Sequence, residues 1–435
     1  MQLTSEEKSM LAGEESALVK EAMRFLVALG EAYDADRMVD ITYANIVLGS
    51  SFWGKGALTR ELVEKAVEQG LRVKVPTTFN NWGLWDPETP DTVWQEMEVP
   101  ETVKEQVLWE NELATKMGII PTCTCAPFLN CDTGTNLKGS YISTIESSAI
   151  VYFNSVFGVR ANRDCVASFF AAITGKYPNC GVYLDENRYG DIHFEVQVDL
   201  SDPLEYGLLG IYAGKISGKQ TPVFTGLSQP KTYALMELSA ALASSGAVTM
   251  FHMVGVTPEA PDLKTAFGGK KPKKKVVVTK EELGKTFHQL SNREGKVDFI
   301  CLGCPHYSIY EMADIADRLE NKKIHPEVTL WVCTSPATAG FAHMAGYAQK
   351  IRDSGAVIMS GPNFCPVFGP GKPCPEYTFS HPGYSVGNFA TEATKQAFYA
   401  RPNLRAQKVF LGTREQCVEA ALTGYWEGGT SWKSS

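Results

Sequence analysis

The chain has 435 residues, of which 44% are hydrophobic and 21% charged, and its formal net charge is −8. This length allows two or three domains, each with its own core. The negative charge argues against nucleic acid as the main partner, because phosphate binding needs a basic face. No run of about 18 apolar residues is present, so the sequence predicts no membrane span.

The first residues are polar and carry no apolar core after a basic start, so they do not resemble a secretory signal. The chain has 11 cysteines, and without a secretion signal these favour reduced thiols used for metal binding or catalysis over a disulfide framework. We therefore expect a cytoplasmic protein.

In chain order, Thr4 and Glu7 predict a helix start with a capping box. The apolar spacing then predicts the following elements in the first 260 residues: helices in 5–33, 58–69 and 233–244, one or two buried helices in 147–173, and strands at 39–48, 71–75, 207–213 and 248–256. Residues 85–100 have the composition of a surface excursion. The lysine-rich segment 268–275 could grip a phosphate, but its composition favours a solvated insertion.

The second half shows the clearest pattern. The elements alternate as strand and helix: strands at 297–302, 328–333, 356–359 and 408–411, and helices at 309–319, 337–354 and 414–422. Such alternation is typical of βαβ units in a parallel sheet. We predict an α/β protein with an N-terminal region at 1–225 and a C-terminal region at 226–435.

Three cysteines follow short apolar runs that read as buried strands. Cys125, Cys304 and Cys365 come after the runs at 117–120, 297–302 and 356–359. Ligands bind at the carboxyl ends of strands in open α/β sheets. Three thiolates meeting there could hold three irons of a cubane cluster and leave the fourth open to substrate, which is the geometry of an iron–sulfur hydro-lyase. A two-iron cluster or a single iron remains open.

Other interpretations of the cysteines also remain open. Cys123, Cys125 and Cys131 could form half of a zinc site in a scaffold subunit, although no partner motif lies nearby, or could be buried core residues. Cys301 and Cys304 form a C-x-x-C pair that could act as a redox dithiol. Cys301 falls inside the predicted strand, which favours a core position, whereas Cys304 stands at the strand's exit and is followed by a proline.

Polar side chains also gather on the apolar helix predicted after Glu146. Buried without hydrogen-bond partners they would be costly, so they form either a satisfied network or the lining of a site. Arg160 and Arg163, at a predicted helix end, suit bidentate capture of a substrate carboxylate, with structural ion pairs as the alternative.

Several short blocks resemble a known family. They are Pro76-Thr-Thr-Phe-Asn80, Glu146-Ser-Ser-Ala, Gly158-Val-Arg-Ala-Asn-Arg163, Gly303-Cys-Pro-His306 and Lys395 with Tyr399. Together they resemble the large, catalytic part of aconitase X over nearly the whole chain. The resemblance implies an aconitase-like fold of several three-layer α/β units with mostly parallel sheets, and an iron-dependent hydro-lyase. It also implies a small swivel subunit, since no Gly-rich serine motif of that kind is present here, and the catalytic base is expected on that partner.

The resemblance also assigns residues. As metal ligands it gives Cys125 (or Cys123), Cys304 and Cys365, holding a four-iron or two-iron cluster or a mononuclear iron. The predicted substrate-binding set is Ser147, Asn154, Arg160, Asn162, Arg163 and Lys395. Known substrates of the family are cis-3-hydroxy-L-proline and mevalonate 5-phosphate. We favour the first, because the negative charge of the chain does not favour a phosphate.

Overall fold

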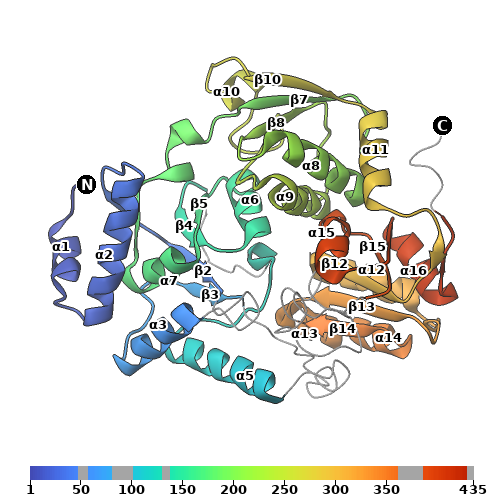
Figure 1. The fold of residues 1–435 in the computed structure, drawn as a ribbon, viewed down its shortest axis with the longest axis horizontal. Coiled ribbons are helices and arrows are strands. Elements are labelled where there is room, and N and C mark those ends of the chain that lie inside the picture. The colour runs from blue at the N-terminus through green and yellow to red at the C-terminus, as the bar shows by residue number, and fades with distance from the viewer. Residues whose placement is uncertain (48–56, 81–100, 130–137, 361–385, 429–435) are drawn as a thin grey trace.

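The computed structural model of the chain describes residues 1–47, 57–80, 101–129, 138–360 and 386–428. It contains three α/β parts, each built on a parallel sheet (Figure 1). Buried side chains from all three parts contribute to one large hydrophobic core. Within the described ranges, no helix has the length and apolar character needed to cross a membrane.

The first sheet has the strand order β3-β2-β4-β5, and all its strands are parallel. Its strands are β2 (Tyr43–Ile46), β3 (Thr77–Phe79), β4 (Tyr141–Thr144) and β5 (Arg160–Arg163). Its helices are α1 (Ser5–Ala12), α2 (Ala17–Ala32), α3 (Ala57–Glu68), α5 (Glu101–Lys116), α6 (Ser147–Ser155) and α7 (Cys165–Thr174). A separate antiparallel pair joins β1 (Met38–Asp40) to β6 (Lys176–Pro178).

Successive residues of β2 face opposite sides of the first sheet, as a strand requires. Tyr43 packs in the large core with α6, whereas Ala44 packs in a second core with α2 and α7. The sheet is therefore covered on both faces, and α6 is the helix that joins it to the rest of the molecule.

The second sheet has the order β10-β7-β8-β9. Its strands are β7 (Ile192–Val196), β8 (Pro222–Thr225), β9 (His252–Met253) and β10 (Lys274–Val278), and its helices are α8 (Pro203–Ser217), α9 (Thr232–Gly246), α10 (Leu263–Ala266) and α11 (Lys280–Leu290). The strand predicted at 207–213 is wrong, because these residues lie in α8. A helix buried on nearly every side has no amphipathic period, so its apolar run resembles a buried strand.

Close packing of α8 against α9 explains two glycines of α8, Gly210 and Gly214. A Cβ atom at Gly214 would lie 2.1 Å from the Ser245 side-chain oxygen, and one at Gly210 would lie 2.5 Å from the Ala241 Cβ. The glycines thus serve the approach of two helices rather than a turn.

The third sheet has the order β14-β13-β12-β15-β16, and all its strands are parallel. Its strands are β12 (Phe299–Tyr307), β13 (Thr329–Thr334), β14 (Val357–Ser360), β15 (Asn388–Thr391) and β16 (Lys408–Leu411). Its helices are α12 (Ile309–Leu319), α13 (Pro336–Met344), α14 (Tyr347–Asp353), α15 (Thr394–Leu404) and α16 (Arg414–Thr423). β11 (Gly295–Lys296) and β17 (Tyr425–Trp426) form a short antiparallel pair beside it.

The predicted βαβ alternation of this third part is confirmed. The single helix predicted at 337–354 is instead two helices, α13 and α14, separated at Gly346, whose φ is +78°. The strand order reverses between β12 and β15, and such a switch point is where open α/β sheets bind ligands at their carboxyl edge.

Among the other predicted elements, some are confirmed and others are wrong. The capping box of Thr4 and Glu7 is confirmed. The strand at 71–75 is wrong, and the run at 117–120 makes only an isolated bridge between Ile120 and Thr78. The helical stretch at 147–173 is interrupted by β5. The excursion at 85–100 lies outside the described residues, and the predicted division at 225/226 falls between neighbouring strands β8 and β9 and stays a prediction.

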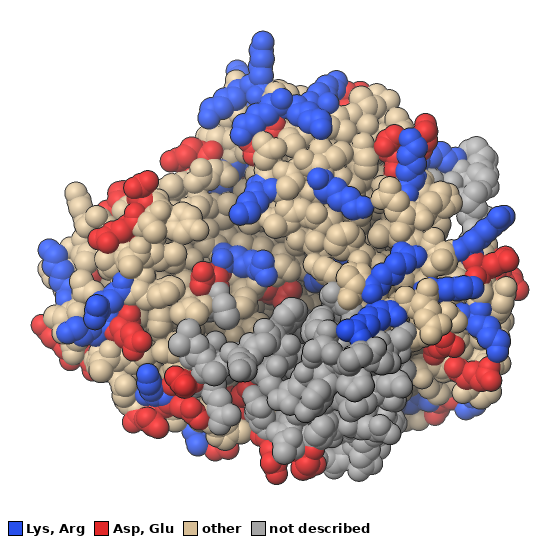
Figure 2. Space-filling model, in the orientation of Figure 1, with Lys and Arg blue, Asp and Glu red and all other residues tan. Residues whose placement is uncertain are grey.

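The lysine-rich segment runs into β10, at the edge of the second sheet. Lysine side chains gather there at the top of Figure 2. Lys273 pairs with Asp191 at 2.6 Å, and Lys275 pairs with Glu195 on the neighbouring strand β7. The lysines are exposed, which agrees with a solvated segment, and charges on an edge strand discourage pairing with another sheet.

Candidate functional site: two cysteines and a buried lysine

Two of the three predicted metal ligands lie in segments that the fold brings together. Cys125 is 5% exposed and Cys304 is 4% exposed. Thr124, next to Cys125, shares a 3.0 Å hydrogen bond between its hydroxyl and Nδ1 of His306, two residues after Cys304. This contact ties the first part of the chain to the third across 182 positions of sequence.

Cys304 lies in an irregular stretch of β12. Pairing with β13 runs regularly to Leu302 and resumes at Tyr307 with a shifted register. The predicted exit of the strand before Cys304 is therefore wrong as a boundary, because β12 continues to Tyr307. Gly303 has a φ of +87°, and a Cβ atom there would lie 2.1 Å from the Cys333 carbonyl oxygen. Only glycine fits, and it bends the backbone immediately before the thiol.

Lys395 is the buried cation of this site. It is the second residue of α15, just after β15 ends, and its side chain is 12% exposed. Its ammonium donates to the Ser148 hydroxyl at 3.0 Å and lies 4.0 Å from Glu146 Oε1. Burial alone would lower the pKa of Lys395, but the nearby Cys304, Glu146 and Cys125 raise it above its usual value. The lysine is thus held charged beside both cysteines.

The first sheet contributes polar groups from its own carboxyl ends. Asn80 follows β3, and its side-chain amide donates to Glu146 Oε2 at 3.1 Å. Glu146 follows β4 and occupies the N-cap position of α6 without capping it. The Asn80 side-chain oxygen is buried and has no hydrogen-bond partner among the described residues. A buried acceptor left in this state costs free energy unless a bound molecule satisfies it.

The donor set suits iron as far as it is described. Thiols are the ligands that hold iron–sulfur clusters, and the two described ones are buried together near one cation. Cys365 lies outside the described residues, and within the described ranges no group of three or more His, Cys, Asp or Glu could hold a metal. Cys123 is also buried, with a φ of +46°, so the choice between it and Cys125 stays open.

The polar residues predicted to bind substrate have mostly structural partners. Arg160 and Arg163 lie on strand β5 and not at a helix end, so that expectation is wrong. Arg160 binds the Tyr183 carbonyl and Asp185. Arg163 donates from Nε to the Ile145 carbonyl at 2.7 Å, next to Glu146.

Two predicted asparagines hold backbone segments in place. Asn162 donates to the Cys180 carbonyl at 2.8 Å and accepts from the Val182 N–H at 3.2 Å. Asn154 both donates to and accepts from the backbone of Ala161. Ser147 is half-buried at the start of α6, and the neighbouring Ser148 makes the contact to Lys395.

Cys301 has a core environment, as its place in the strand predicted. It is fully buried, its sulfur lies 3.5 Å from that of Cys333, and the Gln396 side-chain amide donates to it at 3.1 Å.

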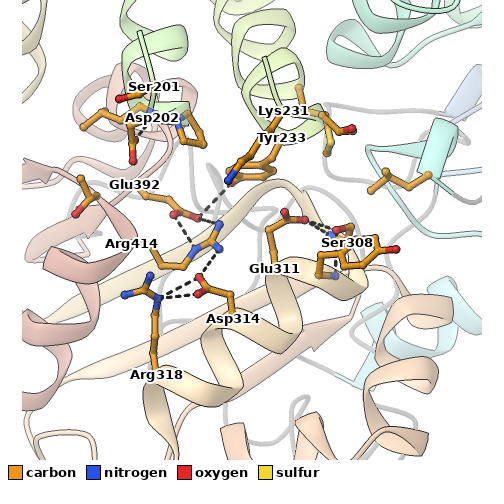
Figure 3. A pocket seen from close by; sticks show the side chains of 17 residues that line it. Ser201, Asp202, Lys231, Tyr233, Ser308, Glu311, Asp314, Arg318, Glu392 and Arg414 are labelled. Atoms are coloured by element: carbon orange, nitrogen blue, oxygen red, sulfur yellow. Dashed lines mark hydrogen bonds and ion pairs between the residues drawn. The ribbon is translucent and has the colours of Figure 1, made fainter. Parts of the chain in front are cut away.

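A cavity of about 610 Å³ opens beside the switch point of the third sheet. Segments that follow β12, β15 and β16 line it, together with the starts of α8 and α9. Figure 3 shows Arg414 between Glu392 and Asp314, with Arg318 also directed at Asp314. Burial would raise the pKa of Asp314, but the two guanidinium groups hold it below its usual value.

Sequence reasoning underused three groups of the site, namely Asn80, Glu146 and Ser148. Asn80 and Glu146 stood at the ends of the blocks that carried the resemblance. For Asn80 and Glu146 the signal was a polar residue at or just past the end of a buried strand, which places it at the carboxyl edge of the sheet.

Comparisons with known proteins match the chain to one family. Family models described as the Aconitase X first, second and third domains match residues 1–186, 190–288 and 297–423. The phosphomevalonate dehydratase large subunit of Methanothermobacter thermautotrophicus is 38% identical over 84% of this chain and 87% of its own length. The cis-3-hydroxy-L-proline dehydratase of Pseudomonas aeruginosa is 34% identical over 96% of this chain but only 69% of its own.

A solved structure is similar as well. The holo-form of Thermococcus kodakaraensis aconitase X superposes with a TM-score of 0.80 and 31% identity, over 97% of this chain and 100% of that one. The predicted aconitase-like α/β fold is thereby confirmed. The chain belongs to the aconitase X family.

Proposed function

We propose that the chain is the large subunit of an iron–sulfur hydro-lyase that dehydrates a small hydroxy acid. The hydro-lyase class predicted from the sequence agrees with its relatives, which are dehydratases. The observation that carries the rest is the hydrogen bond between Thr124 and His306, which joins the segments of Cys125 and Cys304, with Lys395 buried close enough for both thiols to raise its pKa.

Cys125, Cys304 and Cys365 are the proposed ligands of the cluster. A bound cluster with an open iron supplies a Lewis acid for a departing hydroxyl group. Three thiolates fit a four-iron cluster, and a two-iron cluster or a single iron is the alternative outcome.

The chain's own residues orient the substrate. Lys395 is held charged and is fixed by Ser148, so it neutralises and positions a substrate carboxylate. This electrostatic interaction contributes to catalysis because little water enters the site. The Asn80 side-chain oxygen, which has no donor among the described residues, takes a hydrogen bond from a substrate N–H or O–H. The other predicted residues, Arg163 above all because it lies next to Glu146, stay candidates for contacts to substrate.

Two substrates have support from specific observations. The acid–base pair of Glu146 and Lys395 suits an amino acid with one carboxylate and one ammonium, which favours cis-3-hydroxy-L-proline. Mevalonate 5-phosphate is favoured by chain length: archaeal phosphomevalonate dehydratase large subunits match over most of their own length, including 95% and 100% of two of them.

A small partner chain completes the proposed enzyme. The name "large subunit" of several relatives implies such a partner for them. The catalytic base is expected on that chain. The cytoplasmic location stays a prediction.

The test is chemical analysis of the anaerobically purified protein for iron and acid-labile sulfide, with a visible spectrum. We expect both elements in wild type and their loss in Cys304→Ala and Cys365→Ala. Cys417→Ala, which removes a buried thiol in α16, is the matched control and should retain them. With the small partner added, both candidate substrates are then assayed for water loss.

Iron without sulfide would keep the hydro-lyase and make it mononuclear. Zinc alone, or activity that depends on Cys301 without any metal, would overturn the proposal in favour of a scaffold subunit or a thiol oxidoreductase.

A further inference from the structure

We propose that Glu392 is a positioning residue that fixes the place of Lys395 relative to Cys304. The inference rests on the proposed function, because it concerns the same site. It assigns a role to a buried charge cluster that the proposed chemistry does not itself use.

The carboxylate of Glu392 collects donors from three other elements. It is 7% exposed and accepts from the Tyr307 hydroxyl at the end of β12 and from the Tyr233 hydroxyl on α9 at 3.2 Å. It also accepts from Arg414 Nε, at the start of α16, at 3.1 Å. One side chain from the β15–α15 connection is thus bound to β12, α9 and α16.

Arg414 completes this cluster and keeps it rigid. Its guanidinium donates to the Tyr307 hydroxyl at 3.0 Å and to Asp314 at 2.8 Å. It also stacks over the rings of Tyr307 and Tyr233, at 4.5 Å and 5.5 Å from their centroids. We call Glu392, Arg414, Tyr307 and Tyr233 the carboxylate clamp. The hydrogen bonds and ring contacts of the planar Arg414 guanidinium are directional, so they fix the relative position of these side chains more closely than apolar contacts would.

The clamp holds the two segments that carry the site. Tyr307 comes three residues after Cys304 on the same strand, at the point where pairing with β13 resumes. Glu392 comes three residues before Lys395, and the N-cap of α15, Ala393, has no side-chain cap of its own. The contact between Tyr307 and Glu392 therefore ties the end of the cysteine strand to the start of the lysine helix.

Stability alone does not account for such a cluster. A buried ion pair costs desolvation and is often replaced by apolar residues without loss of stability. What it supplies is a fixed separation of two elements, and small misplacements of reacting groups cost rate steeply. The clamp therefore acts on turnover through Lys395 and Cys304, without itself touching the substrate.

Glu392→Gln tests the clamp, because it keeps the shape and removes the charge. Asp202→Asn is the matched control: Asp202 lines the same cavity and caps α8, accepting from the Leu204 N–H, and among the described residues it makes no hydrogen bond to 304–308 or 392–396. Tyr233→Phe is a milder second variant that deletes one donor to Glu392. Each is assayed as the complex with the small partner, and hydrogen exchange is measured on the large chain.

We expect Glu392→Gln to lower kcat about 10- to 100-fold with a smaller change in KM. Hydrogen exchange should quicken in 304–308 and 392–396 together, with Tyr233→Phe showing a weaker form and Asp202→Asn neither effect. Equal kinetics in Glu392→Gln and Asp202→Asn, or faster exchange in only one of the two segments, overturns the inference. If the wild-type complex dehydrates neither substrate, the proposed function fails instead, and exchange still decides whether the clamp couples the segments.

Discussion

Gly303 provides the sharpest test of how the backbone presents Cys304. Replacing it by alanine puts a Cβ atom 2.1 Å from the Cys333 carbonyl oxygen at a φ of +87°. The left-handed region costs a non-glycine residue about 1–2 kcal/mol. Overpacking against a fixed backbone atom adds about 1–3 kcal/mol. The expected loss for Gly303→Ala is therefore about 2–5 kcal/mol.

Calorimetry of the metal-free protein measures this loss. A shift of roughly 2–4 °C per kcal/mol puts the fall in Tm at about 4–20 °C for the transition that includes the third sheet. Gly340→Ala is the matched control, since a Cβ atom there meets nothing within 4 Å and the residue lies in helix α13. That control should gain about 0.5–1 kcal/mol, because alanine restricts the unfolded chain. A Gly303→Ala protein whose Tm lies within about 1 °C of wild type would refute the reasoning, because the smallest expected fall in Tm is about 4 °C.

Two further predictions concern buried charges. Lys395→Met should lower kcat/KM of the complex about 100-fold, because it removes the charge that orients the substrate carboxylate. Lys296→Met, at an exposed position, is the control and should leave kcat/KM unchanged. Unchanged kinetics in Lys395→Met would contradict the role of this lysine. Burial, and then the nearby Glu392, raises the pKa of Glu237 well above its usual value, so the folded chain holds this proton more tightly than the unfolded chain does. Wild-type stability should therefore fall as pH rises through and beyond about 4.3, the pKa of a glutamate in the unfolded chain. In Glu237→Gln, the urea midpoint should depend less on pH than in wild type between about pH 5 and pH 8. Equal pH dependence of the urea midpoint in the two proteins would contradict this prediction.

Local patterns predicted much of the third part of the fold. Strand β16 and helix α12 lie where the sequence placed them, because short apolar runs and amphipathic spacing act over a few residues. The same patterns misread α8, whose burial by α9 removes any periodic signal. They left open whether 147–173 forms one helix or two, and they did not show the strand β5 between the two helices, since that strand is short and half polar.

The candidate site also has residues that could be predicted from the sequence and residues that could not. Cys304 and Lys395 could be found from the sequence, Cys304 because it stands near the carboxyl end of a predicted strand and Lys395 because it belongs to the blocks that resemble the family. Arg160 could not be excluded, since its partners Tyr183 and Asp185 come from a turn more than twenty residues away. The hydrogen bond between Thr124 and His306 could not be predicted from the sequence either.

The sequence by itself determined the α/β class and the family, because these depend on local periodicity and on which residue types are present. Only the tertiary structure decided which polar groups share one place. Contacts between Lys395 and Ser148, or between Glu392 and Tyr307, join segments far apart in the chain. Such contacts follow from how three sheets pack together, and no short stretch of sequence carries that information.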